Sequence, residues 1–117
     1  MTLVDTSVWA NHLRRADRRL VQLLDDAQVV CHPFVIGELA CGYLGRRAEV
    51  LALLARLPVV QPVSQAEALA FIEVNLLAGS GVGWVDVHLL ASARLARVSV
   101  FTADKALERA AARLGLA

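Results

Sequence analysis

The alternation of short apolar strands with helical segments constrains the fold of this chain more than any other feature. Four valine-containing runs have the composition of β-strands, at residues 2–4, 29–32, 59–61 and 98–102. The segments between and after them are rich in Ala, Leu and Arg and are predicted to be helical, at 8–14, 18–26, 34–43, 47–57, 65–77, 85–97 and 105–114. Helices inserted between apolar strands imply parallel pairing through right-handed crossovers. We therefore predict an α/β fold, a three-layer α/β/α sandwich with a central, mostly parallel sheet of four or five strands.

Length and composition narrow the class of protein further. No repeat or linker divides the 117 residues, so we expect residues 1–117 to form a single domain. The mean hydropathy of +0.55 is high for a soluble domain and favours a surface that a partner covers. The apolar stretches are too short and too interrupted to span a bilayer, and the first residues lack the pattern of a signal peptide. We expect a cytoplasmic protein with no membrane association.

The cysteines and histidines do not form a recognisable metal or catalytic pattern. Cys31 and Cys41 lack the paired spacing of a zinc site, and we expect both to be buried free thiols. His12, His32 and His88 are not spaced as ligand pairs, so none of them is assigned a catalytic role. The acidic residues are therefore the remaining candidates for a catalytic or metal-binding site.

Four of the eleven acidic residues stand in apolar surroundings, whereas the others lie among charged or polar neighbours. The four are Asp5, Glu38, Asp86 and Asp104. An acid within an apolar run needs a partner that compensates its burial. Asp5 and Asp104 each come just after a predicted strand, and each has a threonine close by, Thr6 and Thr102 respectively. Taken singly, each acid could still be a helix cap or a dipole partner, or could pair with an arginine.

The predicted fold brings these four acids to one rim of the sheet. Strand ends and helix starts of parallel α/β folds face the same edge, where ligands bind. Two carboxylates about 4 Å apart repel by roughly 4 kcal/mol at an effective dielectric constant near 20, so such a cluster needs protons or cations. Magnesium suits carboxylate oxygens and substrate phosphate, and no cluster of His and Cys favours zinc. The acids therefore predict a hard divalent cation.

Four segments together resemble a known family: DTSVW after the first strand, ELACG after PFVIG, GWVDVHLLASA, and TAD after VSVF. They are similar to the PIN-domain ribonucleases, specifically the VapC-type toxins of type II toxin–antitoxin systems. The resemblance covers essentially the whole chain and implies a small α/β/α endoribonuclease that uses magnesium or manganese. It implies that the four acids are catalytic and that Thr6 and Thr102 are supporting hydroxyls. Asp5, Asp86 and Asp104 are the expected metal ligands, and Glu38 is expected to hold a second ion or to orient the attacking water.

The same resemblance implies partners and a reaction. The partners are an RNA substrate and a VapB-type antitoxin that blocks the acidic crevice. A homodimer is also expected, because the helices predicted at 47–57 and 65–77 are too apolar for the surface of one small domain. The reaction is metal-assisted phosphodiester hydrolysis that leaves 5′-phosphate and 3′-hydroxyl ends.

Other functions of α/β domains fit the residues less well. A haloacid dehalogenase type of phosphotransferase needs a second Asp two residues after the first, where this chain has Ser7. A receiver-like signalling domain needs a phosphoacceptor Asp after a central strand, where the run at 59–61 leads into Pro62 and Val63. A catalytically idle PIN-like or receiver-like binding domain remains the alternative, and magnesium-dependent cleavage of RNA would separate it from an enzyme.

Overall fold

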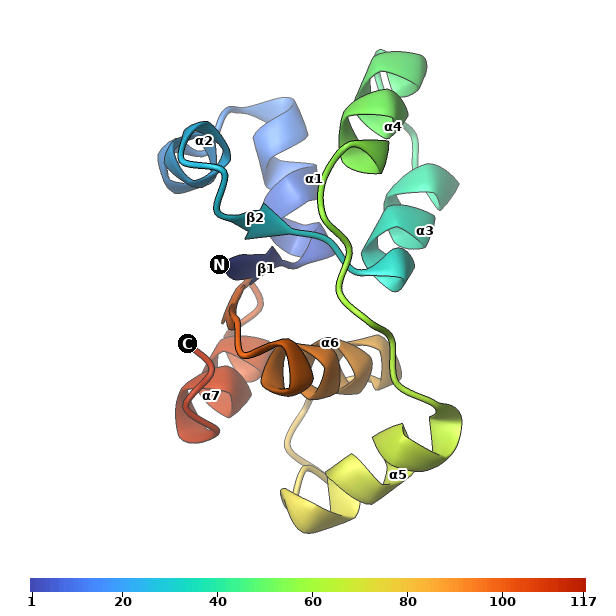
Figure 1. The fold of residues 1–117 in the computed structure, drawn as a ribbon, viewed down its shortest axis with the longest axis vertical. Helices are drawn as coiled ribbons and strands as arrows, with labels where there is room; N and C mark the ends of the chain where they lie inside the picture. The colour runs from blue at the N-terminus through green and yellow to red at the C-terminus, as the bar shows by residue number, and fades with distance from the viewer.

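The computed structural model describes all 117 residues as an alternation of strands and helices. In chain order the elements are β1 (Thr2–Val4), α1 (Thr6–Arg14), α2 (Arg18–Asp25), β2 (Val29–Val30), α3 (Pro33–Cys41), α4 (Arg47–Ala55), α5 (Gln65–Val74), α6 (Trp84–Ala96), β3 (Ser99–Phe101) and α7 (Lys105–Arg113). A small sheet separates α1 to α4 on one side from α5 to α7 on the other (Figure 1). The predicted three-layer α/β/α arrangement is therefore confirmed.

The sheet has the order β2-β1-β3 and all its strands are parallel. Leu3, in the middle of β1, pairs with Val30 on one side and Val100 on the other. These side chains are buried, as expected for a parallel sheet with helices on both faces. Because β1 and β3 are neighbours, their carboxyl ends lie side by side, and Asp5 and Thr102 follow them directly.

The sheet has three strands, so the prediction of four or five was wrong. The third predicted strand forms only an isolated parallel bridge between Cys31 and Val59. Its two hydrogen bonds run from the Cys31 amide to the Pro58 carbonyl (2.8 Å) and from the Val60 amide to the Cys31 carbonyl (2.9 Å). Pro58 and Pro62 flank this run, and because proline has no backbone N–H the ladder is not extended at either end.

Side-chain caps explain where several helices begin and end. The Asp5 side chain caps α1, which therefore begins at Thr6, two residues earlier than predicted. The ring of His32 caps α3 and ends the second strand at Val30, earlier than predicted. α5 ends at Val74 instead of residue 77, because the chain leaves the helix through Leu76, whose backbone is left-handed (φ 54°).

The two cysteines lie in different surroundings. Cys31 is buried, and burial raises the pKa of its thiol to about 11. Cys41 is exposed, so the expectation that both thiols are buried was wrong for this residue. Cys41 is the last residue of α3, at the point where the chain turns away into an exposed loop.

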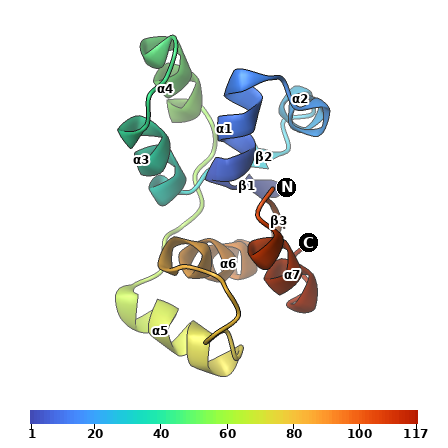
Figure 2. The same ribbon diagram turned by 180° about the vertical axis from the view of Figure 1, so that it is seen from behind.

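The two ends of the chain lie on opposite edges of β3 (Figure 2). The Ser99 amide donates to the Met1 carbonyl (3.2 Å), and the Val100 amide donates to the Leu116 carbonyl (2.6 Å). No helix in the structure combines the length and the apolar character needed to cross a lipid bilayer.

Candidate active site

Asp5 is held in one orientation at the end of β1. Its side chain is only 6% exposed and accepts three hydrogen bonds. The Thr6 amide donates to Oδ1 (2.8 Å), while the hydroxyls of Ser7 and Thr102 both donate to Oδ2 (2.7 Å each). Short hydrogen bonds to a carboxylate are the stronger class of such bonds, so the first turn of α1 and the residue that follows β3 together fix this side chain firmly.

The same hydroxyls connect Asp5 to Asp104. The Asp104 amide donates to Thr102 Oγ1 (3.0 Å), and the Ala103 amide donates to Ser7 Oγ (3.0 Å). The exposed Asp104 side chain accepts the Leu107 amide at Oδ2 (2.9 Å) and thereby caps α7. Asp104 is thus anchored to the network around Asp5, although its own carboxylate faces solvent.

Ser7 belongs to this network and was not among the predicted site residues. It donates to Asp5, accepts from Ala103, and its hydroxyl lies 3.3 Å from that of Thr102. Its position two residues after Asp5, in the first turn of α1, is the signal that could have indicated this role.

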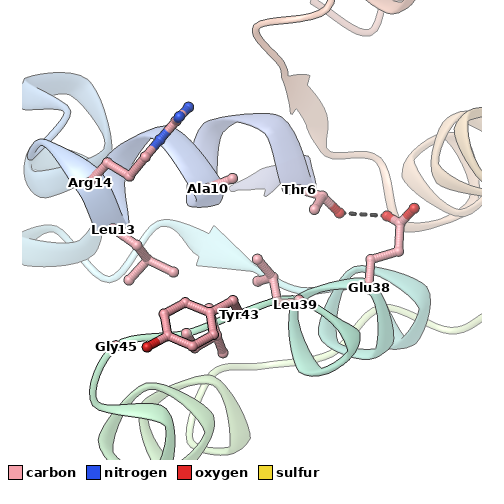
Figure 3. Close-up of a pocket in the computed structure, with 10 residues that line it drawn as sticks. Thr6, Ala10, Leu13, Arg14, Glu38, Leu39, Tyr43 and Gly45 are labelled. Atoms are coloured by element: carbon pink, nitrogen blue, oxygen red, sulfur yellow. Dashed lines mark hydrogen bonds between the residues drawn. The ribbon is translucent and has the colours of Figure 1, made fainter.

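Glu38 reaches the network from α3, on the other side of α1 from β3. Thr6 Oγ1 donates to Glu38 Oε1 (2.6 Å), so Thr6 contacts both acids, with its amide on Asp5 and its hydroxyl on Glu38 (Figure 3). Glu38 is exposed and has no arginine partner. The pairing with an arginine considered for Glu38 is therefore absent.

Asp86 lies in the first turn of α6 and is half-buried. The Gly83 amide donates to its Oδ2 (2.9 Å). Burial raises the pKa of the Asp86 carboxyl above its ordinary value, and the hydrogen bond from Gly83 opposes that rise. The negative charges of the other three acids add to it. Asp86 is therefore within electrostatic reach of all of them.

The four acids thus gather at one rim, which we call the acidic site: Asp5, Glu38, Asp86 and Asp104. The capping alternative describes part of the arrangement, since Asp5 and Asp104 cap α1 and α7, and Asp86 accepts the amide of the residue that precedes α6. Capping does not explain the exposed Glu38, nor why the other acids raise the pKa of Asp86. Helix capping and a shared acidic site are therefore both present.

A divalent metal ion fits this site in charge and in donor type. The groups joined there by hydrogen bonds are carboxylates, hydroxyls and amides, and carboxylate oxygens suit magnesium and manganese. No three His, Cys, Asp or Glu side chains lie close enough together to hold an ion as they stand. A bound ion would therefore require the acidic side chains to move toward one another.

Two histidines pack beside the acidic site in an aromatic cluster. The His88 ring lies 4.8 Å from Phe34 and 4.7 Å from Trp84, measured between ring centroids, and His32 lies 5.0 Å from Phe34. The pKa of His32 is lowered to about 4, first by burial and then by the charge of His88. His32 therefore stays neutral at physiological pH, with Nδ1 accepting the Phe34 amide (2.9 Å).

Comparison with known proteins agrees with this arrangement. The family profile described as PIN domain matches residues 2–113. The chain belongs to the PIN-domain family. This PIN domain is also 48% identical to Ribonuclease VapC32 from two strains of Mycobacterium tuberculosis, CDC 1551 / Oshkosh and ATCC 25618 / H37Rv, over 118 aligned residues. The alignment covers 100% of this chain and 95% of the relative, so the resemblance to VapC-type ribonucleases predicted from the motifs is confirmed.

A solved structure supports the fold independently of the sequence. The crystal structure of FitAcB from Neisseria gonorrhoeae matches this PIN domain with a TM-score of 0.66, over 96% of this chain and 94% of the other. The two chains are only 22% identical, so this likeness bears on the fold alone.

Proposed function

We propose that this PIN domain is the toxin ribonuclease of a toxin–antitoxin pair, and that it hydrolyses RNA phosphodiester bonds at the acidic site with magnesium or manganese. The observation that carries the proposal is that four carboxylates from separate segments gather at one rim. Thr6 bonds to Asp5 and Glu38, and Thr102 bonds to Asp5 and to the amide of Asp104. Burial raises the pKa of Asp86, and the charges of the other three acids add to that rise. Such repulsion persists in a folded protein when the cluster serves a cation or a proton. Full-length similarity to a protein named as a ribonuclease supports the substrate class.

Asp5, Asp86 and Asp104 would hold the ion. When bound, a divalent ion lowers the pKa of a water and offsets the charge of the scissile phosphate. Asp5 contributes a fixed ligand, because three hydrogen bonds hold its carboxylate. Asp86 and Asp104 each have one oxygen hydrogen-bonded to a backbone amide, so the other oxygen of each could bind an ion.

Glu38 and the hydroxyls supply the remaining functions. Glu38 is exposed, and the hydroxyl of Thr6 binds only one of its oxygens, so the other can orient the attacking water or hold a second ion. Thr102 keeps Asp5 and the backbone of Asp104 at a constant separation, since its hydroxyl bonds to both. With these roles, the carboxylates would hold the ion and the ion would offset the charge of the phosphate.

Asp5→Asn tests this function, with Asp17→Asn as the matched control. Both residues cap a helix, since Asp17 Oδ1 accepts the Leu20 amide (2.9 Å), but only Asp5 belongs to the acidic site. Purified proteins are incubated with total RNA in magnesium, in manganese and with a chelator, and the RNA ends are sequenced. We expect wild type and Asp17→Asn to cleave with either metal and leave 5′-phosphates, and Asp5→Asn to be inactive.

Magnesium binding is measured separately from cleavage, by thermal unfolding. A ligand that binds only the native state at a concentration of about 100 Kd stabilises it by about 2.7 kcal/mol. We expect magnesium to raise the melting temperature of wild type and Asp17→Asn and to raise that of Asp5→Asn much less. Equal magnesium shifts in all three proteins, with cleavage intact in Asp5→Asn, would refute the metal assignment. A folded wild type that binds RNA without cleaving it would indicate the idle binding domain instead.

The partners follow from the same proposal. We expect this toxin to act in the cytoplasm, where a cognate VapB-type antitoxin covers the acidic site. A homodimer is expected because apolar side chains on α4, α5 and the loop after α5 remain well exposed: Leu53, Leu69, Val74 and Leu76. Light scattering of the purified protein at micromolar concentration should give the mass of two chains, and the mass of one chain would contradict this.

A further inference from the structure

A pocket of about 530 Å³ opens directly from the acidic site. It runs between α1 and the loop that joins α3 to α4, and Thr6 and Glu38 form one end of it (Figure 3). Leu13, Leu39 and Leu44 line its walls. Its volume lies in the range of pockets that hold small organic ligands. We call it the α1–α3 pocket.

Arg14 provides a cation at the end of the pocket remote from Glu38 (Figure 3). It lies eight residues after Thr6 on the same helix, which corresponds to about 12 Å. Its Nη2 donates to Asn11 Oδ1 (3.0 Å), which fixes the guanidinium and leaves most of its N–H groups free. No carboxylate pairs with it, since the only ion pair in the structure joins Arg46 and Glu49.

Tyr43 stands at the rim of the same pocket and is fully exposed. It is the only tyrosine of the chain, in the loop sequence GYLG after α3. Figure 3 shows its ring on the wall opposite Leu13 of α1. Exposed aromatic rings of this kind act as stacking platforms for unpaired bases. An aromatic face and an uncompensated arginine therefore share one pocket next to the acidic site.

We propose that the α1–α3 pocket binds a nucleotide of single-stranded RNA next to the scissile phosphate, with its base against Tyr43 and its phosphate on Arg14. This inference rests on the proposed ribonuclease function. A protein segment could also use the leucine walls, but an unpaired guanidinium fork beside an open aromatic ring suits a phosphate and a base better. Continuity with the acidic site through Thr6 and Glu38 puts the bound nucleotide in line with the bond to be cut.

Kinetics of three variants test the pocket, with one control. The variants are Arg14→Gln, Tyr43→Ala and Tyr43→Phe. The control is Arg97→Gln, which removes the charge of an exposed arginine at the end of α6 opposite to Asp86. The substrate is a labelled oligoribonucleotide that spans the site mapped in total RNA. Base stacking on an aromatic ring affects affinity by about 5- to 150-fold, so Tyr43→Ala should raise KM about tenfold or more. Tyr43→Phe keeps the ring and should restore most of the affinity that Tyr43→Ala loses.

Arg14→Gln should also raise KM about tenfold, with kcat close to that of wild type, because a phosphate contact remote from the acids affects binding more than chemistry. RNA affinity is then measured in the cleavage-deficient Asp5→Asn background at several salt concentrations. One lost phosphate contact lowers the slope of log affinity against log salt by about 0.7 for a single strand. Arg97→Gln should change neither KM nor the slope.

The outcomes separate this inference from the proposed function. If wild type cleaves RNA but Arg14→Gln and Tyr43→Ala keep its KM and its salt slope, the pocket does not bind RNA. If those two variants lose affinity for the cognate antitoxin while their KM for RNA stays that of wild type, the pocket is a protein-binding surface and the inference is wrong. If wild type does not cleave at all, the proposed function fails. The affinities of Arg14→Gln and Tyr43→Ala for the same oligoribonucleotide, compared with Arg97→Gln, then still decide whether the pocket binds RNA.

Discussion

Replacing Thr102 with valine should destabilise the protein measurably, because this hydroxyl joins the ends of two strands. Thr102 is 7% exposed, donates to Asp5 Oδ2 (2.7 Å) and accepts the Asp104 amide (3.0 Å). Valine has nearly the same shape but offers neither a donor nor an acceptor. A hydrogen bond to a charged group contributes about 1.5–3 kcal/mol, so we expect Thr102→Val to lower the free energy of unfolding by about 2 kcal/mol.

Thr2→Val is the matched control at the other end of the same strands. Thr2 is also 7% exposed, but its hydroxyl makes one neutral contact, with the hydroxyl of Ser99 at 3.3 Å. Removing so long a hydrogen bond between neutral groups should lower the free energy of unfolding only slightly, and the higher β propensity of valine offsets part of that loss. We therefore expect Thr2→Val to stay within about 0.5 kcal/mol of wild type.

Urea unfolding in the presence of a chelator measures both changes. The slope m is about 1–3 kcal/mol/M for small proteins, so a loss of about 2 kcal/mol moves the midpoint by roughly 1 M. Cleavage by Thr102→Val should also slow, because Asp5 loses one of the three donors that orient it. Equal midpoints for Thr102→Val and Thr2→Val would refute the claim that a charged network joins β1 to β3.

Three further substitutions probe the acidic site and its surroundings. Asp86→Asn should raise the unfolding free energy of the metal-free protein at neutral pH, because the pKa of Asp86 is raised and its ionised form is disfavoured. That gain in stability should shrink as pH falls through the raised pKa, because protonation of Asp86 removes the same negative charge from wild type. A gain that does not depend on pH would contradict this explanation. His32→Asn keeps a side-chain cap for α3. Because the pKa of His32 falls from 6.5 to about 4 on folding, wild type should lose stability relative to the variant as pH falls across that range. A difference in urea midpoints that stays constant with pH would count against this. Glu38→Gln, at an exposed position, should change stability by less than about 0.5 kcal/mol yet strongly reduce cleavage of RNA, and undiminished cleavage would remove Glu38 from the mechanism.

The parallel sheet and its neighbouring acids could be predicted because the signals are local. Short apolar runs followed by Asp5 and by Thr102 and Asp104 mark strand ends, and parallel strands place such ends on one edge. The valines at 59 and 60 predict a third strand, but this run forms only one isolated bridge, between prolines 58 and 62. Proline has no N–H for the ladder, and that signal was visible in the sequence.

Other features of the site and the fold depend on contacts between distant parts of the chain, which no local sequence pattern indicates. The bond that Ser7 accepts from the Ala103 amide forms only when β1 pairs with β3, because the two residues are 96 positions apart. The meeting of Arg14 and Tyr43 around one pocket depends on how α1 packs against α3. Exposure of Cys41 likewise follows from where α3 leaves the core. Tertiary packing decided each of these positions.

The central position of β1 affects when the hydrogen-bond network around Asp5 can form during synthesis of the chain. β1 is the first strand to leave the ribosome, yet one of its two neighbours in the sheet, β3, is the last. The bond between Asp5 and Thr102 spans 97 residues, and Asp104 follows two positions later. Contacts of such long sequence separation form late in folding, because the loop between them must first close. Asp5 is therefore synthesised long before the hydroxyl of Thr102, and the hydrogen-bond network that holds its carboxylate can form only after residues 102–104 have been made.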